Sequence, residues 1–335
     1  MRTWLVTGGL GFIGSNFIRT VLLEREDVSI VNLDALTYAG NPANLADVEN
    51  HAQYHFIKGD ICDAEAVAGA FSRPIDAVIN FAAQSHVDRS VFEPEAFLRT
   101  NVLGTHVLLE AARRANVARF LQVSTDEVYG EIAEGSSLET DPLLPRSPYA
   151  ASKAGGDLQA LAYGATYGTP VLVTRGSNTY GPYQYPEKLI PLFVTNLLEG
   201  KSAPLYGDGR QIRDWIHVED HVRGILHVLE RGRVSNVYNV GGGNPRQNKE
   251  IARRLAVLSG RRFETHVRHV QDRPGHDRRY SIDCTKLSEL GWTPQRKFDE
   301  GLAETVAWYR DHEDWWRPLK DRLTPDYASR FATLS

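Results

Sequence analysis

Through about residue 240, the chain alternates short apolar runs with longer amphipathic segments. The apolar runs are rich in Val, Ile and Leu and are bounded by Gly, Asp or Asn, a pattern typical of buried strands. The predicted strands are residues 3–7, 28–33, 54–57, 77–83, 119–123, 171–175 and 236–240.

Helical periodicity fills several of the intervals between these strands. Apolar residues recur at helical spacing from Phe17 to Leu22, residues 101–115 form a long amphipathic pattern, and Pro148 fits the first turn of another helix. Strands that alternate with helices predict an α/β fold with a Rossmann-like, doubly wound parallel sheet.

The composition adds limits to this picture. The chain has 335 residues, of which 42% are hydrophobic and 24% charged, as in an ordinary soluble globular protein. The net charge of -4 gives no reason to expect nucleic-acid binding, and no apolar run approaches membrane-spanning length. There is no signal-peptide pattern, and Cys62 and Cys284 suit a reducing compartment, so we expect a cytoplasmic protein without disulfides.

A glycine loop follows the first predicted strand. Gly8, Gly11 and Gly14 allow a tight turn and a close approach of the backbone to a pyrophosphate at a helix N-terminus. Asp34 ends the second strand about 20 residues beyond the loop, where an acid accepts from the adenosine ribose and repels a 2′-phosphate. The loop and this acid predict a dinucleotide site that prefers NAD to NADP.

The pattern changes after about Asn178, where Pro, Gly and Tyr become frequent, and residues 187–200 are predicted to be helical. We therefore expect two domains. Residues 1–178 would form the NAD-binding Rossmann domain, to which residues 217–241 return. Residues 179–216 and 242–335 would mainly form a smaller, mixed substrate domain.

The strand at residues 119–123 leads into Thr125, Asp126 and Glu127. Ligands of an open parallel sheet bind beyond the carboxyl ends of its strands. Neighbouring carboxylates in a dry cleft repel each other, so one can keep its proton near neutral pH while the other is ionised. This stretch therefore offers an acid and a base beside a substrate, although it would also serve as a helix cap.

Tyr149 and Lys153 are four residues apart and share one face of a predicted helix. An ammonium near a phenol favours the phenolate, so we expect Lys153 to lower the pKa of Tyr149 below its ordinary value of about 10. Tyr149 would then work as a general base.

Several polar loop residues have two interpretations. Asp60 would lie under the adenine or cap the next helix, and His86 would contact a substrate or be structural. His217 and His221 have a metal-ligand spacing but no third ligand nearby, so we expect a helix start there. The basic stretch at residues 272–280 would be a solvated charge run or a pyrophosphate clamp.

The glycine loop together with Tyr149 and Lys153 resembles the extended short-chain dehydrogenase/reductases. A more specific resemblance, to the dTDP-glucose 4,6-dehydratases, is carried by longer motifs over nearly the whole chain. They are residues 36–41 (LTYAGN), 85–90 (SHVDRS), 124–130 (STDEVYG), 183–191 (YQYPEKLIP), 211–215 (QIRDW) and 273–280 (RPGHDRRY). Gln84 and Gln247 depart from the family pattern, in which Glu and Thr are usual.

The resemblance implies NAD as cofactor, dTDP-glucose as substrate and a homodimer that pairs two helices of each nucleotide domain, with no metal. The implied cofactor-binding residues are Gly8, Gly11, Phe12, Ile13, Gly14, Asp34, Ala35, Leu36, Thr37, Asp60, Ile61, Phe81, Ala82, Ala83, Ser85, Thr100, Tyr149 and Lys153. The implied substrate-binding residues are His86, Thr125, Asn178, Lys188, Leu189, Pro204, Tyr206, Arg213, Asn248, Arg273, His276 and Tyr280.

The implied reaction is an intramolecular redox cycle that oxidises C4 of the glucosyl unit, eliminates water across C5 and C6, and reduces C6. The resemblance assigns Tyr149, Thr125 and Lys153 to the C4 hydroxyl, Glu127 to the C5 proton and Asp126 to the departing C6 hydroxyl. Such an elimination needs both a base and an acid.

Three alternatives remain open from the sequence. A UDP-sugar 4-epimerase needs only the Thr, Tyr and Lys set, so the carboxyl pair favours dehydration. A 4,6-dehydratase that acts on another sugar nucleotide would have the same scaffold and the same catalytic residues. An inactive NAD-sensing regulator would have no use for the acid and base residues.

Overall fold

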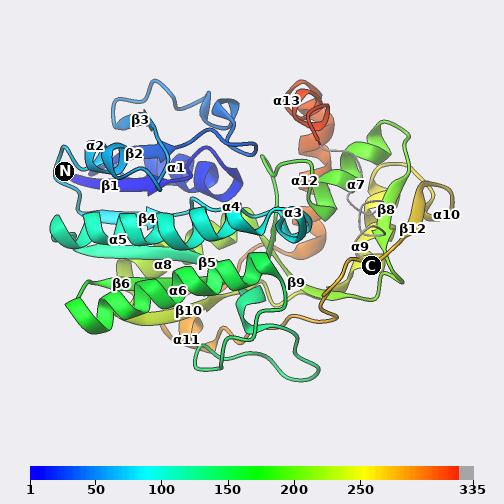
Figure 1. Cartoon of the computed structure of the whole chain (residues 1–335). Helices are drawn as coiled ribbons and strands as arrows, with labels where there is room; N and C mark the ends of the chain where they lie inside the picture. The colour runs from blue at the N-terminus through cyan, green and yellow to red at the C-terminus, as the bar shows by residue number, and fades with distance from the viewer. Residues whose placement is uncertain (324–335) are drawn as a thin grey trace.

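Seven parallel strands form the central sheet of the computed structural model, which describes residues 1–323 (Figure 1). From edge to edge the order is β10 (Asn236–Val240), β6 (Val171–Gly176), β5 (Arg119–Thr125), β4 (Ala77–Asn80), β1 (Arg2–Thr7), β2 (Val28–Asp34) and β3 (Tyr54–Lys58). The predicted parallel, doubly wound sheet is therefore confirmed.

The strand order reverses between β1 and β4, which places the expected ligand crevice at the carboxyl ends of these two strands. The predicted strand at residues 77–83 is too long, because β4 ends at Asn80. The glycine loop that follows β1 packs directly against the backbone that follows β4, because a Cβ on Gly8 would lie 2.6 Å from the backbone nitrogen of Ala82. This close approach ends the strand ladder and joins the two loops of the crevice.

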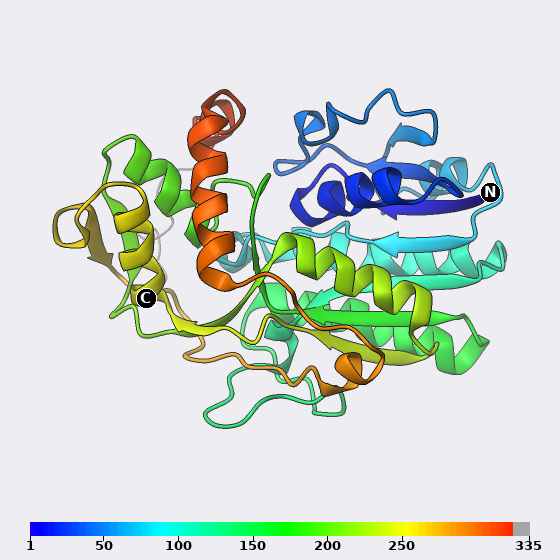
Figure 2. The same cartoon turned by 180° about the vertical axis from the view of Figure 1, so that it is seen from behind.

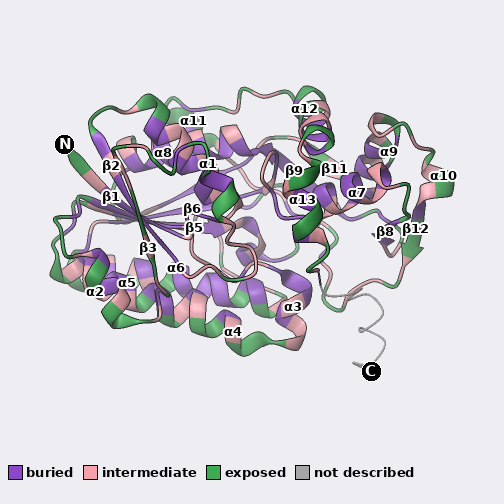
Figure 3. Cartoon of the chain, turned by 90° about the horizontal axis from the view of Figure 1, so that it is seen from above, coloured by how far each residue is buried: buried purple, intermediate pink, exposed green. Residues whose placement is uncertain are grey.

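Helices cover both faces of the sheet, as Figure 3 shows from above. One face carries α1 (Phe12–Glu24), α8 (Val218–Arg231) and α11 (Thr285–Glu289), and the other carries α2 (Ala64–Ala70), α5 (Thr105–Arg114) and α6 (Pro148–Tyr167). Each face has its own apolar core. On β1, Trp4 and Val6 belong to the α1 and α8 core, whereas Leu5 belongs to the α5 and α6 core. This alternation is the two-residue period of a strand.

The predicted helix at residues 101–115 is divided in the structure. Residues Arg99–Gly104 form a π-helical turn, and α5 begins only at Thr105. The preceding chain forms the short helices α3 (Val87–Phe92) and α4 (Pro94–Leu98). Single π turns are frequent at functional sites, and this one carries Thr100, which lines the cavity described below.

A smaller module packs beside the carboxyl end of the sheet. Its strands are β7 (Asn178–Tyr180), β8 (Ala203–Tyr206), β9 (Ile212–His217), β11 (Pro245–Gln247) and β12 (Val267–Val270), and its helices are α7 (Leu189–Leu198), α9 (Asn248–Leu258), α10 (Phe263–His266), α12 (Phe298–Asp311) and α13 (Glu313–Lys320). It has a separate apolar core that includes Phe193, Leu255 and Tyr309. Residues 324–335 of the predicted second domain lie outside the described residues.

Aromatic side chains join this module to the sheet domain, and α12 stands on the side of the module that faces this domain in the reverse view (Figure 2). Tyr183 packs against Trp308 with ring centroids 4.7 Å apart, and the Arg19 guanidinium lies 4.3 Å from the Tyr183 ring. Trp315 donates its indole N–H to Asn44 at 3.0 Å. These contacts fix the two walls of the crevice relative to each other.

No helix within residues 1–323 is long and apolar enough to cross a membrane.

Candidate active site

A cavity of about 480 Å³ occupies the predicted crevice, between the carboxyl end of the sheet and the smaller module. Almost all of the site residues expected from the sequence line it, including the glycine loop, the Thr125 stretch, Tyr149, Lys153 and the substrate-domain residues. Leu36 and Tyr280 do not line it. The Leu36 backbone N–H instead donates to Asp34 at 2.8 Å, so its contribution to the site is to hold that carboxylate.

The glycine loop forms a cradle that larger residues would fill. A Cβ on Gly14 would lie 2.4 Å from the Gly8 carbonyl oxygen, and Gly8 itself has φ of 68°, a conformation that favours glycine. Asp34 accepts backbone N–H groups from Leu10 at 2.9 Å and from Leu36. These features fit a dinucleotide whose pyrophosphate approaches the loop backbone and whose ribose meets Asp34.

Asp60 also lines this end of the cavity and accepts the Cys62 backbone N–H at 2.8 Å. The alternative in which Asp60 caps the next helix is wrong, because Asp63 is the N-cap of α2. Both cysteine thiols are free, and burial raises the pKa of each to about 12. Neither thiol is therefore an activated nucleophile.

The end of β5 carries a hydroxyl and two carboxyl groups into the cavity. Thr125 lies opposite Gly176 of β6 in the sheet register, and its hydroxyl donates to Asp126 Oδ1 at 3.3 Å. Asp126 Oδ2 and Glu127 Oε2 are buried and find no hydrogen-bond partner within residues 1–323. Buried polar atoms of this kind ordinarily have a partner, so both oxygens are suited to meet a ligand.

Burial, the Glu127 charge and the Asp214 charge raise the pKa of Asp126 well above its ordinary value. Asp126 is 2% exposed, so water contributes little to the stability of its charged form. The direction of this pKa shift is the one that the sequence predicts for one member of the carboxyl pair. Thr125 also caps the short helical turn Asp126–Tyr129, so the capping interpretation and the chemical one both apply to this stretch.

Tyr149 and Lys153 lie in the first two turns of α6, which Ser147 caps and in which Pro148 occupies the first turn, as the sequence predicts for Pro148. The Lys153 ammonium donates to the Val123 carbonyl at 2.7 Å. The expected lowering of the Tyr149 pKa is wrong for this arrangement. Burial raises it well above its ordinary value, and the nearby Glu127 charge raises it further.

Two guanidinium groups face the cavity from the smaller module, that of Arg213 buried and that of Arg273 partly buried. Arg213 stacks on Tyr280 at 4.2 Å from the ring and donates to the Asp277 carbonyl at 2.9 Å. Arg273 pairs with Asp88 at 3.2 Å. Paired guanidinium groups suit a pyrophosphate. Tyr280 therefore supports Arg213 from outside the cavity lining.

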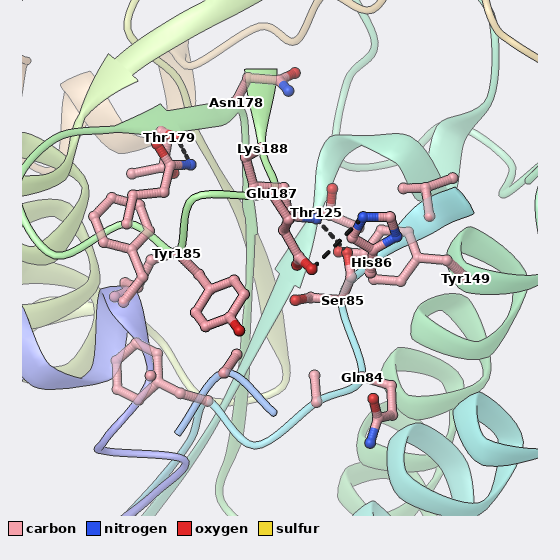
Figure 4. Close-up of a pocket in the computed structure, with 18 of the residues that line it drawn as sticks. Gln84, Ser85, His86, Thr125, Tyr149, Asn178, Thr179, Tyr185, Glu187 and Lys188 are labelled. Carbon is pink, nitrogen blue, oxygen red and sulfur yellow. Dashed lines mark hydrogen bonds and ion pairs between the residues drawn. The ribbon is translucent and has the colours of Figure 1, made fainter. Parts of the chain in front are cut away.

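Glu187 points across the cavity wall toward His86 (Figure 4). Its carboxylate lies 3.6 Å from His86 Nε2 and accepts the Tyr38 hydroxyl at 2.9 Å, and burial raises its pKa to about 7. Burial lowers the pKa of His86 to about 3, so its ring is neutral while Nδ1 accepts the Arg89 backbone N–H. Lys188 donates to the Ser85 carbonyl at 2.5 Å, which ties the smaller module to the loop after β4.

Sequence reasoning missed Asp88, Glu187 and His221, all of which line the cavity. Asp88 and Glu187 lie inside motifs that carried the resemblance, which was the available signal. His221 bonds through Nδ1 to Thr179 at 2.7 Å, while His217 caps α8. Within the described residues, no group of three or more His, Cys, Asp or Glu side chains is arranged to hold a metal ion.

Comparisons with known proteins agree with this geometry. A family model described as GDP-mannose 4,6 dehydratase matches residues 5–305. A dTDP-glucose 4,6-dehydratase from Streptomyces griseus is 54% identical over 94% of this chain and 96% of its own length. The crystal structure of DesIV, a dTDP-glucose 4,6-dehydratase from Streptomyces venezuelae with NAD and TYD bound, has a TM-score of 0.92 at 53% identity and covers 95% of this chain and 99% of its own.

A second group of relatives shares the fold at lower identity. A UDP-glucose 4-epimerase from Thermus thermophilus in complex with NAD has a TM-score of 0.85 at 34% identity, and covers 92% of this chain and 99% of its own. The two dehydratases above are more similar to this chain than the epimerase is, because they are 54% and 53% identical to it over 94% and 95% of its length. The chain therefore belongs to the dTDP-glucose 4,6-dehydratase family, within the extended short-chain dehydrogenase/reductases.

Proposed function

We propose that the protein dehydrates dTDP-glucose to dTDP-4-keto-6-deoxyglucose, with NAD as its resident cofactor. The observation that carries this proposal is the carboxyl pair at the end of β5, which lies in one cavity with Tyr149, Lys153 and the dinucleotide loop. Two relatives named dTDP-glucose 4,6-dehydratase are 54% and 51% identical to this chain, and the matches cover 96% and 97% of their own lengths.

The residues that would hold NAD are the glycine loop with Phe12 and Ile13, Asp34 and its loop, Asp60 and Ile61, and the loop after β4. When bound, NAD supplies a reversible hydride acceptor next to the sugar. Asp34 gives the preference for NAD, because a 2′-phosphate would lie against a buried carboxylate. Thr100, Tyr149 and Lys153 complete the set near the catalytic end.

The protein groups at the catalytic end divide the proton transfers among them. As a phenolate, Tyr149 would take the proton of the C4 hydroxyl, which Thr125 also contacts, and Lys153 would orient both the phenol ring and the ribose. Burial and the Glu127 charge disfavour this phenolate, so the positive charge of bound NAD would have to offset them. The resulting ketone acidifies C5, from which Glu127 removes a proton. Asp126 donates its own proton to the C6 hydroxyl, which leaves as water.

The smaller module would bind the nucleotide. Arg213 and Arg273 would contact the pyrophosphate, while Asn248 and His276 lie on the same side of the cavity. Asn248 keeps the family residue at this position although Gln247 departs from the pattern, and its Oδ1 has no partner within residues 1–323. Asn178, Lys188, Leu189, Pro204 and Tyr206 complete the proposed substrate contacts.

The main alternative is 4-epimerisation, since a 4-epimerase shares the fold at 34% identity. The test is a competition between dTDP-glucose, UDP-glucose and GDP-mannose in deuterated water. We expect dTDP-glucose to yield a 4-keto-6-deoxy product with deuterium at C5, because the Glu127 proton exchanges with solvent. A C4-inverted sugar that keeps its C6 hydroxyl as the product would favour the epimerase. Better turnover of UDP-glucose than of dTDP-glucose would reject the thymidine nucleotide as the preferred substrate but leave the dehydration reaction in place.

The proposal includes a homodimer in the cytoplasm. Exposed leucines support the dimer: Leu98 precedes the π turn, Leu103 lies within it and Leu158 lies on α6, with exposed fractions of 56%, 46% and 57%. Light scattering should give twice the chain mass, and Leu158→Arg should shift it toward the monomer. Cell fractionation of the native host tests the location.

The sheet domain would bind NAD and the smaller module would bind the sugar nucleotide.

A further inference from the structure

A buried cluster of charges lies beneath the catalytic turns of α6: Lys153 lines the cavity, and Asp157 and Arg175 lie behind it, outside the lining. Asp157 follows Lys153 by one helical turn, and its side chain is fully buried. Its Oδ2 accepts from Arg175 Nε at 3.0 Å, and the Arg175 guanidinium lies 4.8 Å from the Tyr129 ring. The cluster thus holds two cations, Lys153 and Arg175, around one carboxylate.

Lys153 needs a counter-charge at this place. It is 5% exposed, and its ammonium donates a hydrogen bond to the Val123 carbonyl, which provides a dipole but no charge. A buried ammonium without a counter-ion loses its proton readily. Residues four apart on a helix are close neighbours, with about 5–6 Å between their Cβ atoms, so Asp157 is within electrostatic reach of Lys153.

The other charged or titratable groups around this cluster come from three elements. They are Tyr149 on α6, Arg175 on β6, and Asp126, Glu127 and Tyr129 in the turn after β5. Glu127, Asp126 and Asp157 all raise the pKa of Tyr149, and Asp157 also raises the pKa of Lys153. Burial is the larger effect on Lys153 and lowers its pKa to about 8. Burial raises the pKa of Asp157 itself, and the charges of Arg175 and Lys153 lower it.

We infer that Asp157 is a positioning residue that keeps the Lys153 ammonium charged, and that Arg175 holds Asp157 ionised for this purpose. The inference rests on the proposed function, in which a charged Lys153 orients Tyr149 and the ribose. Arg175 is well placed for its part, because the sheet register sets it opposite Ser124, one residue before Thr125. The ion pair between Asp157 and Arg175 also fastens α6 to β6. A role in stability alone is therefore the structural alternative to the inference.

The experiment is a titration of Lys153 itself, followed by NMR in protein labelled with carbon-13 at the lysine side chains. The Lys153 signal is assigned by its loss in Lys153→Met. We expect Asp157→Asn to lower the Lys153 pKa by about one unit or more, which is the effect of removing one opposite charge at close range. The alkaline limb of the rate of C4 oxidation should move to lower pH by the same amount.

Asp157→Asn leaves Arg175 buried without its partner, which destabilises the fold. The double variant Asp157→Asn/Arg175→Gln removes both charges and keeps a side-chain hydrogen bond between the two positions. It should fold, and its Lys153 pKa should still be lowered, because Asp157 is the charge that stabilises the Lys153 ammonium. Loss of the Arg175 repulsion makes this lowering smaller than in Asp157→Asn alone. Glu199→Gln is the control: it breaks a partly buried ion pair with Lys320, 2.6 Å long, in the smaller module, and should leave Lys153 unchanged.

An unchanged Lys153 pKa in the folded double variant would overturn the inference and leave the structural alternative. An equal shift in the Glu199→Gln control would also overturn it, because the effect would then be unspecific. The titration requires no turnover. If the unmodified protein made no 4-keto-6-deoxy sugar while Lys153 still responded to Asp157, the proposed function would fail and the electrostatic role would stand.

Discussion

Replacement of Asp126 by Asn tests the division of labour within the carboxyl pair. Asn keeps the size of the side chain and can still accept the Thr125 hydroxyl, which lies 3.3 Å from Asp126 Oδ1. It cannot deliver a proton to a departing hydroxyl. We therefore expect Asp126→Asn to bind substrate and oxidise C4 but to stall before water leaves.

The magnitude follows from the environment of the carboxyl group. Asp126 is 2% exposed, and the cavity wall leaves little water to replace the lost acid. Loss of one positioned acid typically costs about 10²–10⁴-fold, or about 3–5 kcal/mol of transition-state stabilisation. Folding should be little affected, because burial and neighbouring charges already favour the neutral form of Asp126.

The assay is a single turnover with dTDP-glucose in deuterated water, followed by NADH absorbance and by mass spectrometry of the sugar. Asp126→Asn should accumulate NADH and still exchange the C5 hydrogen, because Glu127 is intact. Glu127→Gln should accumulate NADH without exchange at C5. Asp27→Asn, at an exposed ion pair with Arg2, serves as the control and should behave as the unmodified protein.

The reasoning would be refuted by an Asp126→Asn variant that forms product at the unmodified rate. It would also be refuted if both variants exchanged C5 equally, because Glu127 would then not be the base. Loss of the first NADH signal in Asp126→Asn would mean that this carboxyl acts earlier, on C4 oxidation.

Three further outcomes are expected. Denaturation of the purified protein should release NAD, because Asp34 disfavours a 2′-phosphate; mainly NADP in the supernatant would contradict this. Gly14→Ala should purify with little NAD, since its Cβ would lie 2.4 Å from the Gly8 carbonyl, whereas Gly69→Ala, with open space around it, should retain the cofactor. Activity should decline as the pH rises through about 8, where Lys153 loses its proton, and a flat profile across that pH would argue against a charged Lys153.

The sheet was predictable because every strand except the edge strand β3 is largely buried and leaves a continuous apolar run in the sequence. The site was predictable for a related reason, since polar residues that directly follow such strands must gather at one edge. Thr125 and Asp34 are examples, and both line the cavity. The end of β4 was not predictable, because the crossing of the Gly8 loop over Ala82 is a contact between segments far apart in sequence.

Charge states were harder to predict than positions. The spacing of Tyr149 and Lys153 is a local property of one helix, and the sequence reveals it. The direction of the Tyr149 pKa depends on its burial and on Glu127, which reaches it from another element. Glu187 was missed for the same reason: only the folded chain brings it to Tyr38 and His86, and its own neighbours in sequence do not indicate those partners.

The acidity of the carboxyl pair is a property of the whole molecule, although its two residues are adjacent in sequence. Glu127 belongs to the same turn as Asp126, but Asp214, which also raises the Asp126 pKa, lies on β9 of the smaller module, as does Arg213, which lowers it. The packing of the smaller module against the sheet therefore contributes to the balance of charges that raises the Asp126 pKa. A scaffold with the same sheet and the same Tyr149 and Lys153 but a different β9 would have a different acid strength at this position. On this reasoning, the step from C4 oxidation to water loss depends on both modules.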